Sequence, residues 1–470
     1  MRIKYIIVLV LFLYGNAFVA QNKITKLDQF LSFKEYIAYV KKHHPLIKQA
    51  NLQLSIGEAN LLKSRGGFDP KIETDYDEKK FKNTEYFEQL NTTFKIPTWY
   101  GIELKANFEE NTGVYLNPNL NVPEGGLYSA GISFSLAQGF LFNERMATLK
   151  KAKIFVTQSS AQRELLVNNL IFEASTAYFK WLETYKEETI YNRFLNNVQI
   201  RFKGIKRNVE LGEKAAIDSI EAKIALQTRK LNLEAAKLKT KKAKLKVSNY
   251  LWIDKIPLEI QENIIPLLPN DEALSTSLIF KEKNNQEYLL KNHPKLKSLK
   301  AKFDGLKVDR SLKKNKLLPK IDFQYNFLVS DVSQFNNFGT TNYKAFMNFS
   351  FPLFLRKERG DLKITNLKLQ ETNFELTSTV LTIQNKINTI EIEISSLKKQ
   401  KSLINDIVSD YKVMLKAEER KFKLGESSLF FINSREQKLI ASELKANIIA
   451  IKTLNANVKL YKTYGISNLD

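Results

Sequence analysis

The sequence is duplicated internally, and this duplication constrains the fold more than any other feature. His44-Pro45 recurs 249 residues later as His293-Pro294. Pro70-Lys71-Ile72 recurs at the same offset as Pro319-Lys320-Ile321. Repeats of this kind are copies of one structural unit. The chain is therefore expected to fold as two related halves with the same order of elements.

A second block of the duplication keeps a smaller offset. Leu211-Gly212-Glu213 matches Leu424-Gly425-Glu426 at 213 residues, so the first repeat holds 36 more residues than the second between its two blocks. Insertions are tolerated in exposed loops and hairpins rather than in long packed helices. We expect an added hairpin or extended loop at about Glu88–Glu124, because Thr92–Ile96 and Ile102–Phe108 alternate like strands.

Each repeat contains a very long helix followed by a returning one. No proline occurs from Asn143 to Asp254 or from Leu353 onward, and apolar residues recur at spacings of three and four. The spans Asn143–Glu210 and Lys357–Lys421 would each be about 100 Å long at about 1.5 Å per residue. A helix of this length buries its apolar stripe only against other long helices, so we expect two helical hairpins.

Other segments of each repeat alternate between polar and apolar residues. Ile321, Phe323 and Tyr325 interleave with polar residues, and similar alternation occurs within about 70–138 and 319–353. A period of two fits either a half-buried strand of a soluble sheet or a strand of a membrane barrel. A pair of strands per repeat gives four per chain.

The N-terminus has the features of a signal peptide. Arg2 and Lys4 precede the apolar run Ile6–Leu13, which is too short to span a bilayer, and small residues follow at Ala17 and Ala20. The sequence contains no Cys, so an exported chain would fold without disulfides.

These segments predict an order of domains along the chain. The order is a signal peptide at 1–20, a first repeat at 21–250 with strands at about 70–138 and a helical hairpin at about 143–250, a linking equatorial segment at 251–286, and a second repeat at 287–470 with strands at about 319–353 and a helical hairpin at about 357–463.

The strongly basic charge is explained by solvated helix faces. The chain has 73 Lys and Arg residues against 50 Asp and Glu residues, a net charge of +23. Such a balance suits a nucleic-acid binder, but the Lys residues are spread along the chain and export argues against DNA, so no nucleic-acid partner is expected. The densest stretch, Lys237–Lys246, lies in a helical pattern. An anion-attracting lumen or a contact with anionic lipid is the alternative interpretation of that stretch.

The sequence offers no catalytic constellation. Its histidines are His43, His44 and His293, and two of them recur at the repeated helix start. There is no Cys, no Gly-rich phosphate loop, no His-x-x-x-His spacing and no Gly-x-Ser-x-Gly elbow. We expect no enzyme, and no catalytic, cofactor-binding or metal-binding residues.

Membrane strands would force the chain to oligomerise. Four strands cannot close a barrel, and an open sheet edge cannot lie in lipid. Three copies would supply twelve strands, which lies within the even-numbered range of membrane barrels.

The duplicated order of motifs resembles the TolC-type outer-membrane efflux proteins. Each repeat has a His-Pro helix start, a Pro-Lys-Ile strand, an elbow at Gln138–Leu141 or Phe351–Phe354, a long helix and a Leu-Gly-Glu turn. The resemblance covers nearly all of the mature chain. It implies a mainly α fold with a transmembrane β-barrel, in which two repeats of coiled-coil hairpins and strand pairs form a trimeric α-barrel tunnel and a twelve-stranded barrel.

The same resemblance implies a location and partners. The homotrimer would lie in the lipid of the bacterial outer membrane, with its tunnel extending into the periplasm. It would dock to a periplasmic adaptor (membrane fusion) protein and an inner-membrane transporter, as the exit duct of an efflux or type I secretion system.

The resemblance also implies a gate at the periplasmic tip, where the helix hairpins turn. Carboxylates often line that tip six and nine residues after the turn glycine, where the first repeat has Asp218 and Glu221 and the second has Phe431 and Ser434. In the second repeat Glu426 and the aromatic pair are candidates to replace them. The alternative is that all are ordinary helix residues. The candidate gate residues are Gly212, Glu213, Asp218, Glu221, Gly425, Glu426, Phe430 and Phe431.

Two other classes of protein are the rivals to an exit duct. A periplasmic coiled-coil adaptor would have one long hairpin flanking a compact β-domain rather than two hairpins, each with its own strands. A plain porin would be almost all strand, which the long helices exclude. The sequence leaves the cargo open between drugs, metal ions and secreted polypeptides.

Overall fold

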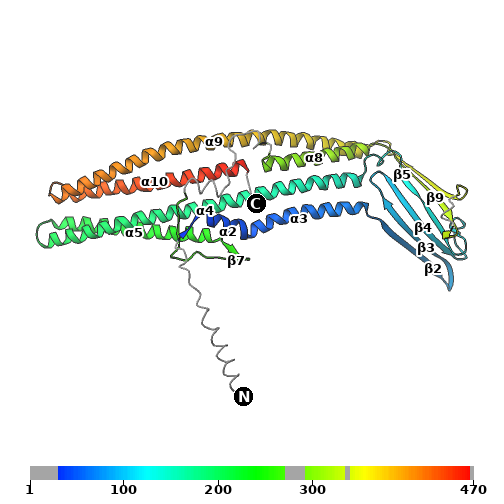
Figure 1. Ribbon diagram of the computed structural model, residues 1–470, viewed down its shortest axis with the longest axis horizontal. Helices are drawn as coiled ribbons and strands as arrows, with labels where there is room; N and C mark the ends of the chain where they lie inside the picture. Colours follow the sequence, from blue (N-terminus) through cyan, green and yellow to red (C-terminus); the bar gives the residue numbers. More distant parts are fainter. Residues whose placement is uncertain (1–29, 270–289, 291, 334–338, 466–470) are drawn as a thin grey trace, which may run out of the picture. The chain divides into compact units, whose positions relative to one another are not determined.

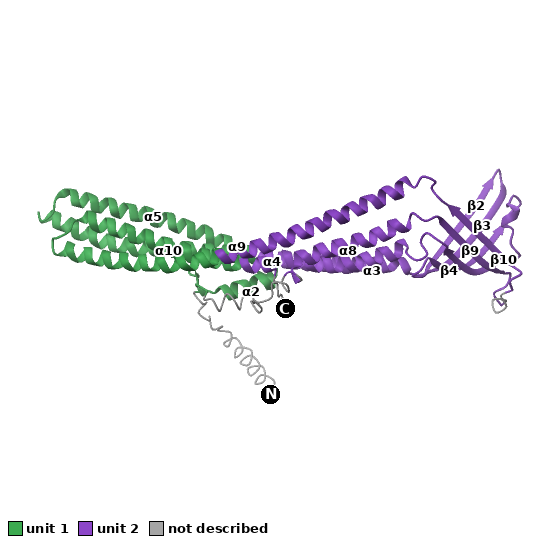
Figure 2. Cartoon of the chain, turned by 90° about the horizontal axis from the view of Figure 1, so that it is seen from above, with its two compact units in different colours: residues 1–44, 171–280, 393–459 green, residues 45–170, 281–392, 460–470 purple. Residues whose placement is uncertain are grey.

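The computed structural model describes residues 30–269, 290, 292–333 and 339–465. The expected signal peptide at 1–20 and residues 270–286 of the expected linking segment lie outside these residues. The chain divides into two compact units, which Figure 2 colours separately. Unit 1 comprises residues 1–44, 171–280 and 393–459, and unit 2 comprises residues 45–170, 281–392 and 460–470. Each unit draws on both sequence repeats, because the two longest helices contribute to both.

Two helical hairpins dominate the chain, as the long proline-free spans predict. In the first, α4 (Glu144–Glu210, 67 residues) is followed by α5 (Ala216–Ser248). In the second, α9 (Arg356–Lys423, 68 residues) is followed by α10 (Leu429–Tyr464). Figure 1 shows each returning helix beside its long partner. None of the described helices is long and apolar enough to cross a membrane.

Shorter helices begin at the residues whose chemistry favours a start. Ser32 and Glu35 form a capping box at the start of α2 (Phe33–His43). Proline, which suits the first turn of a helix, opens both α3 (Pro45–Arg65) and α8 (Pro294–Asn315). The duplicated His-Pro motif is therefore a repeated helix start.

Unit 1 has an aromatic core where α2 packs on α4. Phe33 stacks on Phe179 with ring centroids 5.0 Å apart, and Tyr178 meets Trp181 edge-on at 5.8 Å. The Tyr178 hydroxyl lies 2.7 Å from the Leu31 carbonyl oxygen, to which it can donate. Two small strand pairs complete this unit. They are the parallel pair β1 (Phe30–Leu31) and β8 (Ile265–Pro266), and the antiparallel pair β6 (Trp252–Ile253) and β7 (Ile256–Pro257).

Unit 2 contains one six-stranded antiparallel sheet with the order β10-β9-β5-β4-β3-β2. Figures 1 and 2 show its strands side by side. The strands are β2 (Lys71–Phe81), β3 (Thr84–Pro97), β4 (Ile102–Thr112), β5 (Leu127–Ser135), β9 (Lys320–Val329) and β10 (Tyr343–Ser350). The short 3-10 helices η1 (Gly66–Phe68) and η2 (Pro118–Leu120) lie in its connections.

The prediction of four strands per chain is wrong, because the sheet has six. The additional residues of the first repeat form β3 and β4, joined by a turn at residues 98–101, as an added hairpin inside the sheet. The hairpin spans Thr84–Thr112 rather than Glu88–Glu124. β3 pairs with β2 and β4 pairs with β5, so the added residues lie within the sheet instead of forming a separate loop.

Candidate functional site

One face of the sheet is apolar across all six strands. Because the strands pair in register, apolar side chains line up from one edge to the other. One such row is Ile72, Phe94, Ala106, Ala130, Phe327 and Tyr343. The next row is Ile96, Leu104, Ile132, Tyr325 and Ala345.

This apolar face is exposed. Ile72 is 73% exposed, Met347 66% and Phe349 62%. Soluble monomers rarely expose continuous apolar patches of this kind, and larger ones mark contact with protein or membrane. Aromatic and aliphatic side chains alternating with polar ones are the pattern of a membrane barrel strand.

The opposite face is concave and mainly polar, with Leu328 of β9 and Phe346 of β10 among the apolar exceptions. Lysines and an asparagine follow one row, at Lys71, Lys95, Lys105, Asn326 and Lys344. Lys105 of β4 reaches across β5 to the Gln324 oxygen of β9 at 3.0 Å. Lys344 of β10 reaches Glu109 of β4 at 3.4 Å, across two intervening strands. Such long reaches are expected on the inner side of a curled sheet, where side chains converge.

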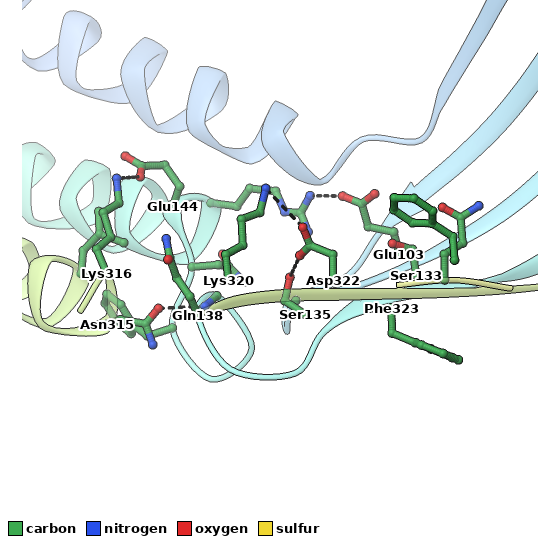
Figure 3. A pocket seen from close by; sticks show the side chains of 18 of the residues that line it. Glu103, Ser133, Ser135, Gln138, Glu144, Asn315, Lys316, Lys320, Asp322 and Phe323 are labelled. Carbon is green, nitrogen blue, oxygen red and sulfur yellow. Dashed lines mark hydrogen bonds and ion pairs between the residues drawn. The ribbon is translucent and has the colours of Figure 1, made fainter. Parts of the chain in front are cut away.

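A hollow of about 670 Å³ lies on this polar face, where the strands meet the ends of α4 and α8. Figure 3 shows its polar side chains, with Phe323 pointing to the other side of the strand. Asp322 accepts from Ser135 at 2.8 Å, and Lys320 pairs with Asp322 at 3.2 Å.

Two further ion pairs occur in the hollow. Arg145 pairs with Glu103 at 2.6 Å, and Lys316 pairs with Glu144 at 3.0 Å. Within the described ranges no group of His, Asp and Glu side chains is arranged to hold a metal ion. The hollow is therefore a polar surface that carries charges of both signs, with four cationic and three anionic side chains.

The two helical hairpins turn at the predicted glycines. Gly212 has φ +78° and Gly425 has φ +81°, in the left-handed region that favours glycine. Both turns are Schellman motifs. Glu213 N–H donates to the Asn208 carbonyl at 2.8 Å, and Gly212 N–H donates to the Val209 carbonyl at 3.0 Å. The same two bonds recur at Gly425 and the residue after it, so the duplicated motif is a duplicated backbone geometry.

The carboxylates predicted for the tip differ in their surroundings. Asp218 lies in the first turn of α5 and is half-buried. Glu221 is half-buried, and its carboxylate accepts from the Asn433 amide of α10 at 3.1 Å. Glu213 and Glu426 are exposed in the turns. Glu221 thus links the two hairpins.

The second tip has an aromatic surface instead. Phe430 is 64% exposed and Phe431 49%, with ring centroids 5.6 Å apart in an edge-on arrangement. Both residues lie in the first turn of α10, so the second hairpin presents aromatic side chains beside the exposed Glu426 of its turn.

A buried ion cluster behind the tips was missed by the sequence reasoning. Glu436 of α10 is 1% exposed; it accepts from Arg201 of α4 at 2.7 Å and lies 3.5 Å from Arg229 of α5. A signal was present, because Glu436 stands on an apolar stripe between the buried Ile432 and Leu439. A charge at such a position requires partners when it is buried.

An apolar seam runs along the exposed side of α5. Its members recur every seven residues and are 47% to 71% exposed. They are Ile217, Ile224, Leu231, Leu238 and Leu245. A heptad seam of this kind packs against another long helix. The Lys237–Lys246 stretch of α5 is partly paired, since Lys239 contacts Glu187 at 2.8 Å and Lys237 contacts Glu234 at 2.9 Å.

His44 and His293 have structural roles. Nδ1 of His293 accepts from Lys295 N–H at 3.1 Å and so caps α8. Nε2 of His293 lies 3.1 Å from the Thr463 carbonyl oxygen. His44 stacks on Tyr250 with ring centroids 5.8 Å apart. Burial lowers the pKa of both His44 and His293, so each is held in its neutral form.

Solved structures of outer membrane channels are similar to this chain. The CmeC outer membrane channel of Campylobacter jejuni has a TM-score of 0.65 and 14% identity, covering 92% of this chain and 85% of that one. A structure of CusC, solved to follow conformational changes during folding and transmembrane channel formation, has a TM-score of 0.68 and 12% identity. The match covers 92% of this chain and 91% of CusC. The open state of the Neisseria gonorrhoeae MtrE outer membrane channel has a TM-score of 0.67 and 14% identity, and the match covers 92% of this chain and 88% of MtrE. Neither a family model nor a curated protein matches the sequence.

These similarities define the class of fold. The chain has the fold of outer membrane efflux channels of the TolC type, which confirms at the level of fold the resemblance drawn from the duplicated motifs. It is mainly helical with a curled β-sheet. At identities of 12% to 14%, the similarity is one of fold and does not extend to individual residues.

Proposed function

We propose that the chain is a subunit of a trimeric exit duct in the bacterial outer membrane, with a tunnel that extends into the periplasm. The observation that carries the proposal is the two-faced sheet. Its apolar face suits lipid, and its concave polar face suits a water-filled lumen. The alternative function, a periplasmic adaptor, would not require an exposed apolar sheet face.

Two unsatisfied surfaces support assembly from several copies. The sheet ends in two open edges, which cannot lie in lipid unpaired. The heptad seam of α5 exposes five large apolar side chains that a long helix of a second copy would bury. A ring of copies covers both surfaces at once, and a trimer is the arrangement implied by the resemblance.

The hairpin turns are proposed as the entrance of the duct, where a periplasmic adaptor and an inner-membrane transporter dock. In a trimer, six turns would surround one axis, with Asp218 and Glu221 present three times each. A ring of like charges attracts cations and repels anions. The transporter would be an efflux pump or a type I secretion transporter, and the duct itself needs no cofactor.

The topology is tested by single cysteines, since the chain contains none of its own. Asn119→Cys lies in the β4–β5 connection, and Glu213→Cys lies in the first hairpin turn. In intact cells a membrane-impermeant maleimide should label the Asn119 variant but not the Glu213 variant. Permeabilising the outer membrane should expose the Glu213 variant. Labelling of both variants, or of neither, in intact cells would contradict the proposed orientation.

The acidic entrance is tested separately. Asp218→Ala combined with Glu221→Ala should raise the conductance of the purified channel or weaken its block by cations, because the ring loses its negative charge. Glu234→Ala, on an exposed side of α5 farther from the turn, is the matched control. Unchanged conductance and cation block in the double variant would remove the gate assignment and leave the duct proposal standing.

A further inference from the structure

We infer that the outer end of the duct is an eighteen-stranded, water-filled barrel, wider than the twelve-stranded barrel implied by the resemblance. The inference rests on the proposed trimer. It follows from the six strands that each copy contributes and from the way the two edges of the sheet match.

The β3–β4 hairpin lies in the middle of the sheet. Its strands pair on both sides, β3 with β2 and β4 with β5, in ten or more registered residue pairs for β2–β3 and β3–β4. Both rows of apolar residues run through it without interruption. A hairpin integrated in this way cannot leave the wall of a barrel without breaking two strand ladders.

The two edges of the sheet are suited to each other. Five successive antiparallel pairings make β2 and β10 run in opposite directions. The β10 edge of one copy therefore pairs antiparallel with the β2 edge of the next, which is the arrangement of a closed membrane barrel. An added hairpin keeps the number of strands even, so closure remains possible.

Exposure and charge support this match. Every residue of β2 and of β10 is exposed, whereas the strands between them are mostly half-buried. The polar face of β2 carries three carboxylates, Glu73, Asp75 and Asp77, against the two lysines Lys71 and Lys79, and that of β10 carries Lys344, which also contacts Glu109 of its own chain. Opposite charges on neighbouring strands stabilise pairing. A second copy of this chain is therefore the occupant that both edges fit.

The width of the barrel follows from the strand count. Barrel diameter grows roughly linearly with strand number, and barrels of about 16 to 18 strands leave an aqueous channel. Eighteen strands would make the diameter about 1.5 times that of a twelve-stranded barrel. The outer end of the duct would then pass bulky hydrophilic cargo, and the size limit for cargo would lie elsewhere in the tunnel.

Disulfide cross-linking in the Cys-free chain tests the edges. Thr74→Cys in β2 is combined in turn with Tyr343→Cys, Ala345→Cys and Met347→Cys in β10, which scans the unknown register on the apolar face. Oxidation of the full-length assembly should give a covalent trimer with at least one pair. The control, Phe108→Cys of β4 with Ala345→Cys, should stay monomeric.

Each other result has a defined meaning. Cross-linking of the control alone would make β4 the barrel edge and overturn the eighteen-stranded barrel. A covalent dimer as the largest product would mean two copies and twelve strands. No cross-link with any pair would overturn the edge match. Ion conductance of the same samples is measured in parallel, so that loss of the duct function and loss of the wide barrel are told apart.

The width is tested by deleting the hairpin. Removal of Thr84–Thr112 joins the end of β2 to the connection that precedes β5, and both lie at the same end of the sheet. β2 can then pair directly with β5, and its apolar residues stay on the same face of the sheet. Polyethylene glycols of graded size are added on the barrel side of the channel in a bilayer. The largest diameter that enters should fall about 1.5-fold. An equal size limit in the intact and shortened channels would contradict the inference.

Discussion

At the scale of single residues, the hairpin turns depend on glycine. Gly212 and Gly425 have positive φ, and a Cβ at either would meet no other atom within 4 Å. The constraint is therefore the backbone conformation and not space. The sequence could predict this role, because a glycine after a long apolar helical pattern in both repeats indicates a helix end.

Replacing a turn glycine should destabilise the protein, whereas replacing a glycine inside a helix should not. Gly425→Ala should lower the free energy of unfolding by about 1–2 kcal/mol, since alanine is strained in the left-handed region. Gly204→Ala, inside α4 and also without neighbours within 4 Å, should raise it by about 0.4–1 kcal/mol. Chemical unfolding followed by circular dichroism measures both. Equal effects of the two substitutions would contradict the role of the turn.

The buried ion cluster is a second feature at this scale. Glu436→Gln removes the charge that neutralises Arg201 and Arg229 inside unit 1. It should destabilise the protein by about 3–5 kcal/mol, because the buried Arg229 loses this carboxylate and the half-buried Arg201 keeps only the carboxylate of Glu419, at 3.8 Å. Glu426→Gln, in the exposed turn, is the matched control and should change stability by less than about 0.5 kcal/mol. A similar unfolding midpoint for both variants would mean that the cluster is solvated.

His293 should make stability depend on pH. Burial lowers its pKa in the folded protein below the ordinary value, so the unfolded chain binds the proton more readily. The stabilisation is complete above the unfolded pKa of about 6.5 and is lost as pH falls through the lower folded pKa. His293→Asn keeps a capping side chain but does not titrate. Its thermal midpoint should fall less between pH 7 and pH 5 than that of the unchanged protein; an equal fall would exclude His293 as the cause.

At the scale of elements, the sequence predicted the helices better than the sheet. Proline-free spans with spacings of three and four identify α4 and α9 because helical periodicity is local. The strand count failed because it was taken from the segments shared by both repeats. Residues 84–112 alternate as clearly as the shared strands, but alternation alone does not show whether a hairpin pairs into a sheet or projects from it.

The contacts between buried polar groups could not be predicted from the sequence either. Arg201, Arg229 and Glu436 come from three helices that are distant along the chain. Their meeting depends on the relative rotation of those helices. The turn glycines needed no such information, since the backbone bonds of a Schellman motif lie within six consecutive residues.

The two faces of the sheet should respond oppositely to a charge. Ala106 lies on the apolar face of β4 and Asn107 on the polar face, one residue apart. Ala106→Arg should destabilise the folded state in lipid by about 2–4 kcal/mol if it lies near the midplane. Asn107→Arg should be tolerated, because the side chain lies on the polar face, which would line the proposed lumen. Folding yield into lipid vesicles measures both, and a tolerated Ala106→Arg would contradict the lipid-facing assignment.

At the scale of the whole molecule, a single chain leaves several surfaces uncovered. Its sheet has two open edges, its apolar sheet face is exposed, and the seam of α5 is uncovered. The proposed ring would cover all three at once, and it would place the polar sheet faces around a common lumen. In the proposal, the function of an exit duct therefore belongs to the assembly and not to one chain.

Ion conduction through that lumen is the most direct measurement of the central claim. Purified full-length protein, shown by circular dichroism to be helical and by light scattering to be a uniform trimer, is added to a planar lipid bilayer. The account predicts discrete, stepwise increases in current, each step marking the insertion of one channel. A helical, uniform protein that inserts into the bilayer and gives no current steps, even after the Asp218→Ala and Glu221→Ala substitutions at the entrance, would contradict it.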